Sequence, residues 1–173
     1  YAIIFINMKI TVITITLNSE KTIRDTLNSV ISQSYKNIEH ILVDGGSTDN
    51  TISILKNYKN KNKKIFIKKK FKIYESINYA IKKSSGKFIC ILNSDDIFQS
   101  NNTIDKFVKF SSKHKKIDIF FGETVYFNFF NYHSIKRYYS SKNFTYKRWW
   151  YYRCYFCSDC NNNRIYRYRV VCG

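Results

Sequence analysis

The sequence lacks any apolar run of the roughly 18 to 20 residues that a membrane-spanning helix needs. Its apolar opening, residues 1–6, is too short for that purpose, and no signal-cleavage site follows it. These absences favour a cytoplasmic protein. The first methionine is Met8, directly before a strand-like run, so we give residues 1–7 no functional weight and expect a leader that is not native.

Proline is absent, and of five cysteines only Cys90 precedes residue 150. Cys90 lies in an apolar run, where a small buried side chain is expected, and a disulfide framework is therefore not predicted. The later cysteines form the pattern Cys154-x-x-Cys157-x-x-Cys160, with Cys172 further on. Thiolates at this spacing can bind zinc or an iron–sulfur cluster. A misread coding frame in AT-rich DNA would also produce closely spaced Cys, Tyr, Arg and Asn residues, and we favour that explanation.

Acidic residues are few, with 12 Asp plus Glu against 30 Lys plus Arg and a formal net charge of +18. This excess suits a surface for phosphates, anionic lipid or nucleic acid. A bias towards AT-rich codons, which favour Lys, Asn, Ile and Tyr, explains it without a partner, and we prefer this interpretation. We therefore expect no specific nucleic-acid partner, while peripheral contact with an anionic membrane stays open.

Apolar residues make up 44% of the chain and aromatic residues 18%, which is enough burial to offset the entropy of folding one domain. Hydrophobic periodicity predicts alternating strands and helices. The predicted strands are residues 9–17, 38–43, 63–68, 87–92, 117–121 and 123–127, and the predicted helices are 20–34, 50–58, 73–84 and 101–112. We expect Asn18 or Ser19 to cap the first helix and Gly86 to end the third.

This alternation predicts an α/β fold, with an open, mostly parallel sheet flanked by helices on both faces. Ligands of such sheets bind beyond the carboxyl ends of the strands. The polar segments at Asn18, at residues 44–49 and at residues 93–96 all fall there, so we expect three separate segments to meet at one edge of the sheet.

Two of these segments carry candidate binding groups. Asp95 and Asp96 follow a buried strand, and adjacent carboxylates in such a place need a cation or hydrogen-bond donors. Oxygen ligands of this kind suit Mg²⁺ or Mn²⁺ on a diphosphate, although either aspartate could instead cap a following helix. At the second strand, the paired glycines after Asp44 permit a tight turn, residues 47–49 can cap the next helix, and Asp44 is left as a free acceptor for a base or ribose.

Three ordered segments together resemble the family 2 glycosyltransferases, which have the GT-A fold, a Rossmann-like fold for nucleotide-diphospho-sugar transfer. They are Ile-Thr-Ile-Thr-Leu-Asn (13–18), Leu-Val-Asp-Gly-Gly-Ser-Thr-Asp-Asn-Thr (42–51) and Ser-Gly-Lys-Phe-Ile-Cys-Ile-Leu-Asn-Ser-Asp-Asp (85–96). The resemblance covers residues 8–128. It implies an inverting enzyme that moves a sugar from a nucleotide diphosphate, often UDP, to a glycan or other hydroxyl acceptor in surface polysaccharide synthesis.

The resemblance also implies roles for individual residues. Thr16 and Asn18 flank the nucleotide, Asp44 hydrogen-bonds the base, and Asp95 and Asp96 hold the ribose and a divalent metal, Mn²⁺ or Mg²⁺. Such a metal neutralises the charge that develops on the leaving nucleoside diphosphate.

The match weakens at the third helix and beyond. Tyr74 and Asn78 match donor-pocket positions, but residues 68–71 are three lysines and a phenylalanine where relatives have acidic and glycine residues. The lysines could hold donor phosphates, although the lost glycine favours a divergent site. Glu123, after Gly122, resembles an acceptor-side acidic residue and is our candidate catalytic carboxylate.

We expect residues 129–173 to be a divergent, incomplete or frameshifted acceptor-side segment, because hydrophobic periodicity disappears after about Phe144. An inverting transferase needs a general base for the acceptor hydroxyl. After Glu123 the only acidic residue is Asp159. We therefore predict that the chain binds donor better than it transfers sugar. The alternatives are a catalytically impaired nucleotide-sugar-binding remnant and, less favoured, a basic nucleic-acid-binding protein.

Overall fold

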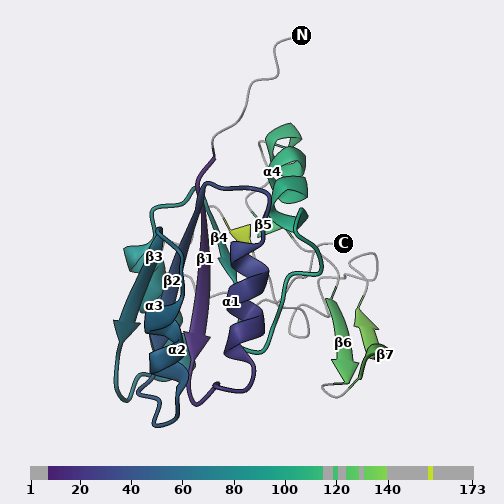
Figure 1. Ribbon diagram of the computed structural model, residues 1–173. Coiled ribbons are helices and arrows are strands. Elements are labelled where there is room, and N and C mark those ends of the chain that lie inside the picture. Colours follow the sequence, from purple (N-terminus) through teal and green to yellow (C-terminus); the bar gives the residue numbers. More distant parts are fainter. Residues whose placement is uncertain (1–7, 115–118, 121–123, 129–130, 140–155, 158–173) are drawn as a thin grey trace, which may run out of the picture.

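A computed structural model describes residues 8–114, 119–120, 124–128, 131–139 and 156–157 of the chain. Figure 1 shows the arrangement of its elements. The helices are α1 (Ile23–Ile31), α2 (Thr51–Asn57), α3 (Ile73–Lys83) and α4 (Thr103–Lys113). The strands are β1 (Ile10–Thr16), β2 (Ile38–Asp44), β3 (Lys63–Ile67), β4 (Phe88–Ile91), β5 (Ile119–Phe120), β6 (Thr124–Asn128), β7 (Asn131–Tyr139) and β8 (Phe156–Cys157).

The main sheet has the strand order β3-β2-β1-β4-β8-β5. β1 pairs in parallel with β2 and β4, and β2 pairs in parallel with β3, which lies at the edge. β8 pairs antiparallel with both β4 and β5. This arrangement confirms the α/β fold with a mostly parallel sheet. β6 and β7 form a separate antiparallel pair, so the two strands predicted around Gly122 lie in different sheets.

Helices cover both faces of the parallel strands, as the alternation predicts (Figure 1). Neighbouring residues of a strand point to opposite faces. On one face Leu42 of β2 packs with Leu27 of α1 and Leu55 of α2, whereas on the other face Ile41 packs with Ala80 of α3. All five side chains are buried, so the core consists of two layers of apolar contacts separated by the sheet.

The β4 side of the sheet is covered by α4. Cys90 of β4 is fully buried in a cluster with Phe107 and Val108 of α4, which confirms the burial predicted for this cysteine. Within the described part of the chain, no helix is long and apolar enough to cross a bilayer.

The first helix begins later than predicted, and its expected caps are wrong. α1 begins at Ile23 with Thr22 as its N-cap residue, and no side chain caps it. The backbone amides of Thr22 and Ile23 instead bond the carbonyl oxygen of Ser19, which makes residues 19–22 a separate turn. The side chains of Asn18 and Ser19 are therefore available to contact other loops.

Gly86 does not end the third helix, which was a further misassignment. α3 ends at Lys83, and Gly86 follows in the connection to β4. A Cβ atom on Gly86 would lie 2.5 Å from the backbone nitrogen of Thr11 in β1. The requirement for glycine is therefore the close approach of this connection to β1.

A buried carboxylate fixes the same connection. Glu39 of β2 is buried, and it accepts hydrogen bonds from the hydroxyl of Thr11 at 2.7 Å and from the amide of Ser85 at 2.9 Å. Its partner cation is Lys64, with 2.6 Å between Nζ and Oε1. Desolvation alone would raise the pKa of Glu39, but Lys64 and the bonds from Thr11 and Ser85 together lower that pKa to about 2.

Residues 1–7, Glu123 and Asp159 lie outside the described residues. Between residues 129 and 173, the structure describes β7 and β8 alone. Neither strand is predicted from the sequence.

A polar pocket at the carboxyl ends of β1, β2 and β4

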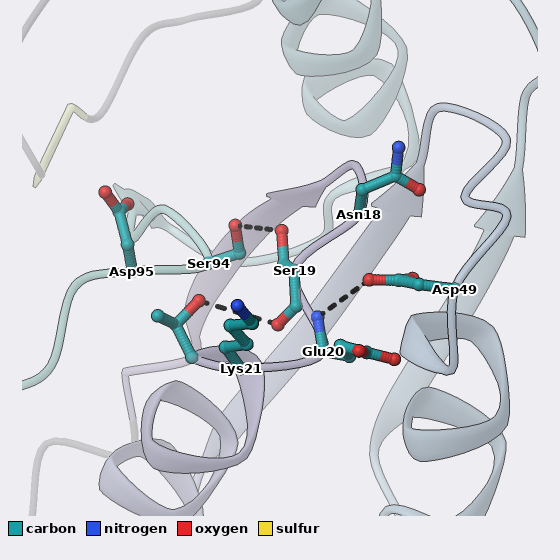
Figure 2. A pocket seen from close by; sticks show the side chains of 8 residues that line it. Asn18, Ser19, Glu20, Lys21, Asp49, Ser94 and Asp95 are labelled. Atoms are coloured by element: carbon teal, nitrogen blue, oxygen red, sulfur yellow. Dashed lines mark hydrogen bonds between the residues drawn. The ribbon is translucent and has the colours of Figure 1, made fainter.

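The loops that follow β1, β2 and β4 meet at the carboxyl edge of the parallel strands and enclose a pocket of about 510 Å³. Figure 2 shows Asp95 and Ser94 on one side and Asn18 and Asp49 on the other, with Ser19 between them. The lining residues are Asn18, Ser19, Glu20, Lys21, Thr22, Asp49, Ser94 and Asp95. Three segments far apart in the sequence therefore form one site, as predicted.

Hydrogen bonds join the loop after β1 to the loop after β2. Asn18 has a left-handed backbone (φ 49°), and its side-chain oxygen accepts the amide of Thr48 at 2.9 Å. The amide of Asn18 donates to Ser47 Oγ at 2.9 Å, and the amide of Ser19 donates to Thr51 Oγ1 at 2.8 Å. Asn is one of the residues that tolerates this conformation well, because its short polar side chain can bond locally. Asn18 therefore organises the pocket.

Two carboxylates complete the connection between these loops. Glu20 accepts the backbone amide of Asn50 at 2.9 Å, and its own amide donates to Asp49 at 3.1 Å. Asp49 also accepts the amide of Thr51 at 3.0 Å. The N-cap residue of α2 is Asn50 and no side chain caps the helix, so the cap predicted at residues 47–49 is wrong. Desolvation raises the pKa of Asp49, but the bonds from Thr51 and Glu20 outweigh it and leave the pKa below its usual value. Asp49 is therefore a carboxylate at neutral pH.

A serine pair joins the third loop to the first. The hydroxyl oxygens of Ser19 and Ser94 lie 2.8 Å apart and share a hydrogen bond (Figure 2). Ser94 directly precedes the paired aspartates, so this bond fixes their loop against the loop after β1. Asp95 is exposed and lines the pocket, whereas Asp96 is half-buried and is not among the lining residues.

The helix-cap alternative for the paired aspartates is excluded. Asp96 donates its amide to the carbonyl oxygen of Asn93 at 3.0 Å and lies in a turn. The next helix, α4, begins at Thr103 with Asn102 as its N-cap residue. Neither Asp95 nor Asp96 caps this helix.

Asp44 is not the free acceptor that the sequence analysis predicts. Its side chain is fully buried, and one oxygen accepts the amides of Gly46 at 2.8 Å and Ser47 at 2.7 Å. The other oxygen accepts the hydroxyls of Thr16 at 2.8 Å and Ser47 at 2.6 Å. The register that places Thr16 beside Asp44 creates this arrangement. Asp44 and Thr16 therefore shape the loop after β2 and are not among the residues that line the pocket.

The remaining predicted residues lie elsewhere. Tyr74 is 37% exposed in the first turn of α3, and Asn78 is half-buried one turn later. Neither belongs to the residues that line the pocket. The structure thus brings Asn18 and Asp95 into the pocket, with Asp96 adjacent in sequence.

Six lining residues are absent from the predicted site: Ser19, Glu20, Lys21, Thr22, Asp49 and Ser94. Asp49 and Ser94 lie within predicted motifs, and residues 19–22 directly follow another, which is the signal that could have identified them. Lys21 differs from the others in charge, since it is the one cationic residue among the described residues that line the pocket.

The donor set fits a hard divalent cation. No three Asp, Glu, His or Cys side chains gather into a metal cluster among the described residues. Mg²⁺ and similar ions, however, are commonly held by one or two carboxylates together with substrate phosphates, rather than by a complete protein cage. Adjacent carboxylates at Asp95 and Asp96 match that arrangement.

Comparison with known proteins identifies the family. The model of the family described as Glycosyl transferase family 2 matches residues 11–171. The chain belongs to glycosyl transferase family 2. The match to this family extends past residue 128, the end of the resemblance predicted from the motifs.

Curated relatives of this family 2 protein include the putative glycosyltransferase EpsE of Bacillus subtilis, 33% identical over 115 residues. That alignment covers 64% of this chain and 41% of EpsE. An uncharacterized glycosyltransferase of Haemophilus influenzae is 32% identical over 111 residues, with 62% of this chain and 34% of the relative covered. The chain thus spans less than half the length of these relatives.

Solved structures show the fold. Staphylococcus aureus TarS 1–349, solved in complex with UDP, matches with a TM-score of 0.58 and 34% identity over 62% of this chain and 33% of that one. A mannosyltransferase from Pyrobaculum calidifontis, solved with GDP-Man and Mn²⁺, matches with a TM-score of 0.57 and 22% identity over 67% and 34%. The family 2 chain therefore has the GT-A fold.

Proposed function

We propose that the pocket binds the diphosphate end of a nucleotide-sugar donor, and that the protein is the donor-binding part of an inverting, metal-assisted glycosyltransferase. The observation that carries this proposal is the meeting of three loops around one pocket, with Asn18 on one side and Asp95 on the other. A UDP-sugar is the proposed donor, because TarS, at 34% identity, was solved with UDP and with UDP-GlcNAc.

Asp95 and Asp96 are the residues that would hold Mn²⁺ or Mg²⁺. A bound divalent cation offsets the charge that develops on the nucleoside diphosphate as it leaves. Lys21 supplies a second positive charge in the same pocket, beside the carboxylates of Glu20, Asp49 and Asp95. A diphosphate would otherwise be repelled by these three carboxylates, so we assign Lys21 to a phosphate oxygen.

The base and ribose are proposed to lie over the loop after β2. The bonds of Asp44 to Thr16, Gly46 and Ser47 give this loop one fixed shape. Asp44 can contact a base only by exchanging one of these bonds. The nucleotide-binding roles inferred from the sequence remain predictions for Thr16, Asp44, Tyr74 and Asn78.

The acceptor side of the reaction is also a proposal. Transfer with inversion requires a general base at the acceptor hydroxyl, and Glu123 remains the candidate. The proposed acceptor is a glycan or another hydroxyl compound in surface polysaccharide synthesis, with the protein in the cytoplasm or at the cytoplasmic face of the membrane. The second candidate is a nucleotide-sugar-binding remnant without turnover, because Asp159 is the only acidic residue in the sequence after Glu123.

Calorimetric titration tests the donor site on the full chain. UDP should bind with Mn²⁺ present and much more weakly with a chelator, whereas uridine should show no metal dependence. Lys21→Gln should weaken UDP binding about tenfold, the value of one charge-assisted hydrogen bond, and leave uridine unchanged. Lys106→Gln on α4 is the matched control. UDP binding that ignores both the metal and Lys21 would refute the proposed site.

A transfer assay separates the enzyme from the remnant. UDP release from a panel of UDP-sugars is followed with glycan acceptors, and the anomeric configuration of any product is determined by NMR. Loss of the general base alone costs roughly 10²- to 10⁴-fold in rate, so slow or absent turnover with intact UDP binding is expected. Rapid multiple turnover would instead show that the chain carries a working base.

A further inference from the structure

The segment between α2 and β4 has a charge unlike the rest of the chain. Residues 56–87 contain twelve lysines and a single acidic residue, Glu75. The lysines are Lys56, Lys59, Lys61, Lys63, Lys64, Lys68, Lys69, Lys70, Lys72, Lys82, Lys83 and Lys87. The segment includes β3, the edge strand of the sheet, and α3 beside it (Figure 1). This segment therefore carries more than half of the formal net charge of +18.

Exposed apolar side chains accompany these lysines at one place. Residues 67–74, Ile-Lys-Lys-Lys-Phe-Lys-Ile-Tyr, are named here the lysine loop. Ile67 is 42% exposed at its start, and Ile73 is 48% exposed with Tyr74 at its end. Lys69, Lys70 and Lys72 between them are also exposed. Leu17, another exposed apolar residue, lies near the same loop, because it and Phe71 both approach Gly45.

The lysine loop has a fixed backbone attached to the loop after β2. The amide of Lys68 donates to the carbonyl oxygen of Asp44 at 2.8 Å, and the amide of Lys70 donates to that of Gly45 at 3.3 Å. Lys70 has a left-handed backbone with φ 69°. Within the described part of the chain, no ion pair joins Lys69, Lys70 or Lys72 to a carboxylate. Two backbone bonds thus hold these lysines next to the loop that bears Asp44, and the nearby carboxylate of Glu75 accepts the backbone amide of Lys72 at 2.6 Å.

We propose that the lysine loop docks the protein on an anionic lipid bilayer. Several lysines close together are attracted to a negatively charged membrane surface, and aliphatic side chains among them can enter the headgroup region. The loop exposes two isoleucines, Ile67 and Ile73, and one aromatic residue, Tyr74. This favours lipid over single-stranded nucleic acid, which is bound by successive aromatic faces along a basic groove. The proposal deepens the membrane-face location proposed above by naming the surface. Vesicle binding can fail while donor binding succeeds, so the two proposals are tested separately.

Docking through this loop would hold the carboxyl edge of the sheet near the bilayer. The fixed bonds from Lys68 and Lys70 to the loop after β2 mean that the donor pocket would not move independently of the docked surface. An acceptor carried by the membrane would then be met close to the site of transfer.

Sedimentation with vesicles tests the proposal on the full chain. The chain should sediment with phosphatidylcholine vesicles that contain phosphatidylserine, should stay in solution with phosphatidylcholine alone, and should be released by salt. The double variant Lys69→Gln/Lys72→Gln should lower the partition coefficient roughly 25-fold, at about fivefold per lysine. Ile73→Ser should weaken binding further in the same background, because it removes the apolar contact.

The matched control is Lys106→Gln/Lys113→Gln, which removes two exposed lysines from α4 on the β4 side of the sheet. It changes the net charge by the same amount and should lower vesicle binding far less. An equal loss in both double variants would overturn the proposal, because it would show a response to total charge. Absence of binding to anionic vesicles would overturn it as well.

Two further measurements distinguish other uses of the same lysines. UDP affinity is measured in the same double variant, and a fall in UDP affinity with full vesicle binding would assign the loop to the donor phosphates instead. A single-stranded oligonucleotide should bind more weakly than anionic vesicles. Tighter oligonucleotide binding that depends on Lys69 and Lys72 would identify a nucleic-acid surface and refute lipid docking.

Discussion

Acidification should weaken the fold of this protein through His40 before its carboxylates titrate. His40 in β2 is fully buried, with Nε2 3.0 Å from Thr14 Oγ1 and Nδ1 3.3 Å from the hydroxyl oxygen of Tyr58. Its ring packs edge-on against Tyr58 at 5.6 Å between centroids. Desolvation lowers the pKa of His40 from 6.5 to about 3, so the imidazole is neutral in the folded protein.

The lowered pKa of His40 determines how the free energy of unfolding changes with pH. As the pH falls below about 6.5, the unfolded chain takes up a proton at His40 and the folded chain does not, so the free energy of unfolding decreases. The loss is about 1.4 kcal/mol per pH unit, which gives about 2 kcal/mol at pH ~5 relative to neutral pH. The stability that neutral His40 contributes is fully present above its ordinary pKa of 6.5. As the pH falls, this contribution decreases until the pH reaches about 3, the pKa of His40 in the folded protein.

Urea denaturation followed by circular dichroism at neutral pH and at pH ~5 measures this loss. His40→Gln cannot gain the charge, so its free energy of unfolding should change about 2 kcal/mol less between the two pH values. Tyr58→Phe keeps the imidazole and should retain the full pH dependence, which guards against a His40 variant that fails to fold. An identical pH dependence in the wild type and His40→Gln would refute the assignment of a neutral, buried imidazole.

Three further predictions concern other contacts of the fold and the pocket. Glu39→Gln should lower the free energy of unfolding by about 3 kcal/mol at neutral pH. The difference from wild type should shrink in urea titrations as the pH falls from about 4.5 towards 2, since protonation of Glu39 removes the same contribution. Gly86→Ala should destabilise the fold by about 1–3 kcal/mol in thermal melts, whereas Gly45→Ala, whose added atom meets nothing closer than 3.4 Å, should be tolerated. Ser19→Ala should weaken metal-dependent UDP binding in calorimetry about fivefold, through loss of its bond to Ser94, without changing thermal stability appreciably.

The strands and the edge at which the site lies could be predicted from the sequence. Apolar and β-branched runs of strand length, separated by segments of helical periodicity, are sufficient to predict β1 to β4 and a parallel sheet. The sheet then brings Asn18, Asp49 and Asp95 to one edge whatever the side-chain details, because the carboxyl ends of parallel strands lie together. This is why the three loops were predicted to meet.

The side-chain contacts could not be predicted in the same way. The bonds of Asp44 depend on the register of β1 against β2, which places Thr16 directly beside it. Gly86 is required by a close approach to Thr11, a residue 75 positions away, and no local pattern signals that contact. α1 starts later than predicted, because the carbonyl oxygen of Ser19 accepts two backbone amides in a turn that competes with the helix.

We propose that the loops after β1, β2 and β4 form the nucleotide diphosphate site. The most direct measurement follows the backbone amide resonances of the full chain during addition of UDP with Mg²⁺. Shifts should concentrate in residues 18–22, 47–51 and 94–96, should be absent from residues 106–113 of α4, and should be much smaller without Mg²⁺. Shifts that avoid these three loops, or that are the same with and without the metal, would contradict the account.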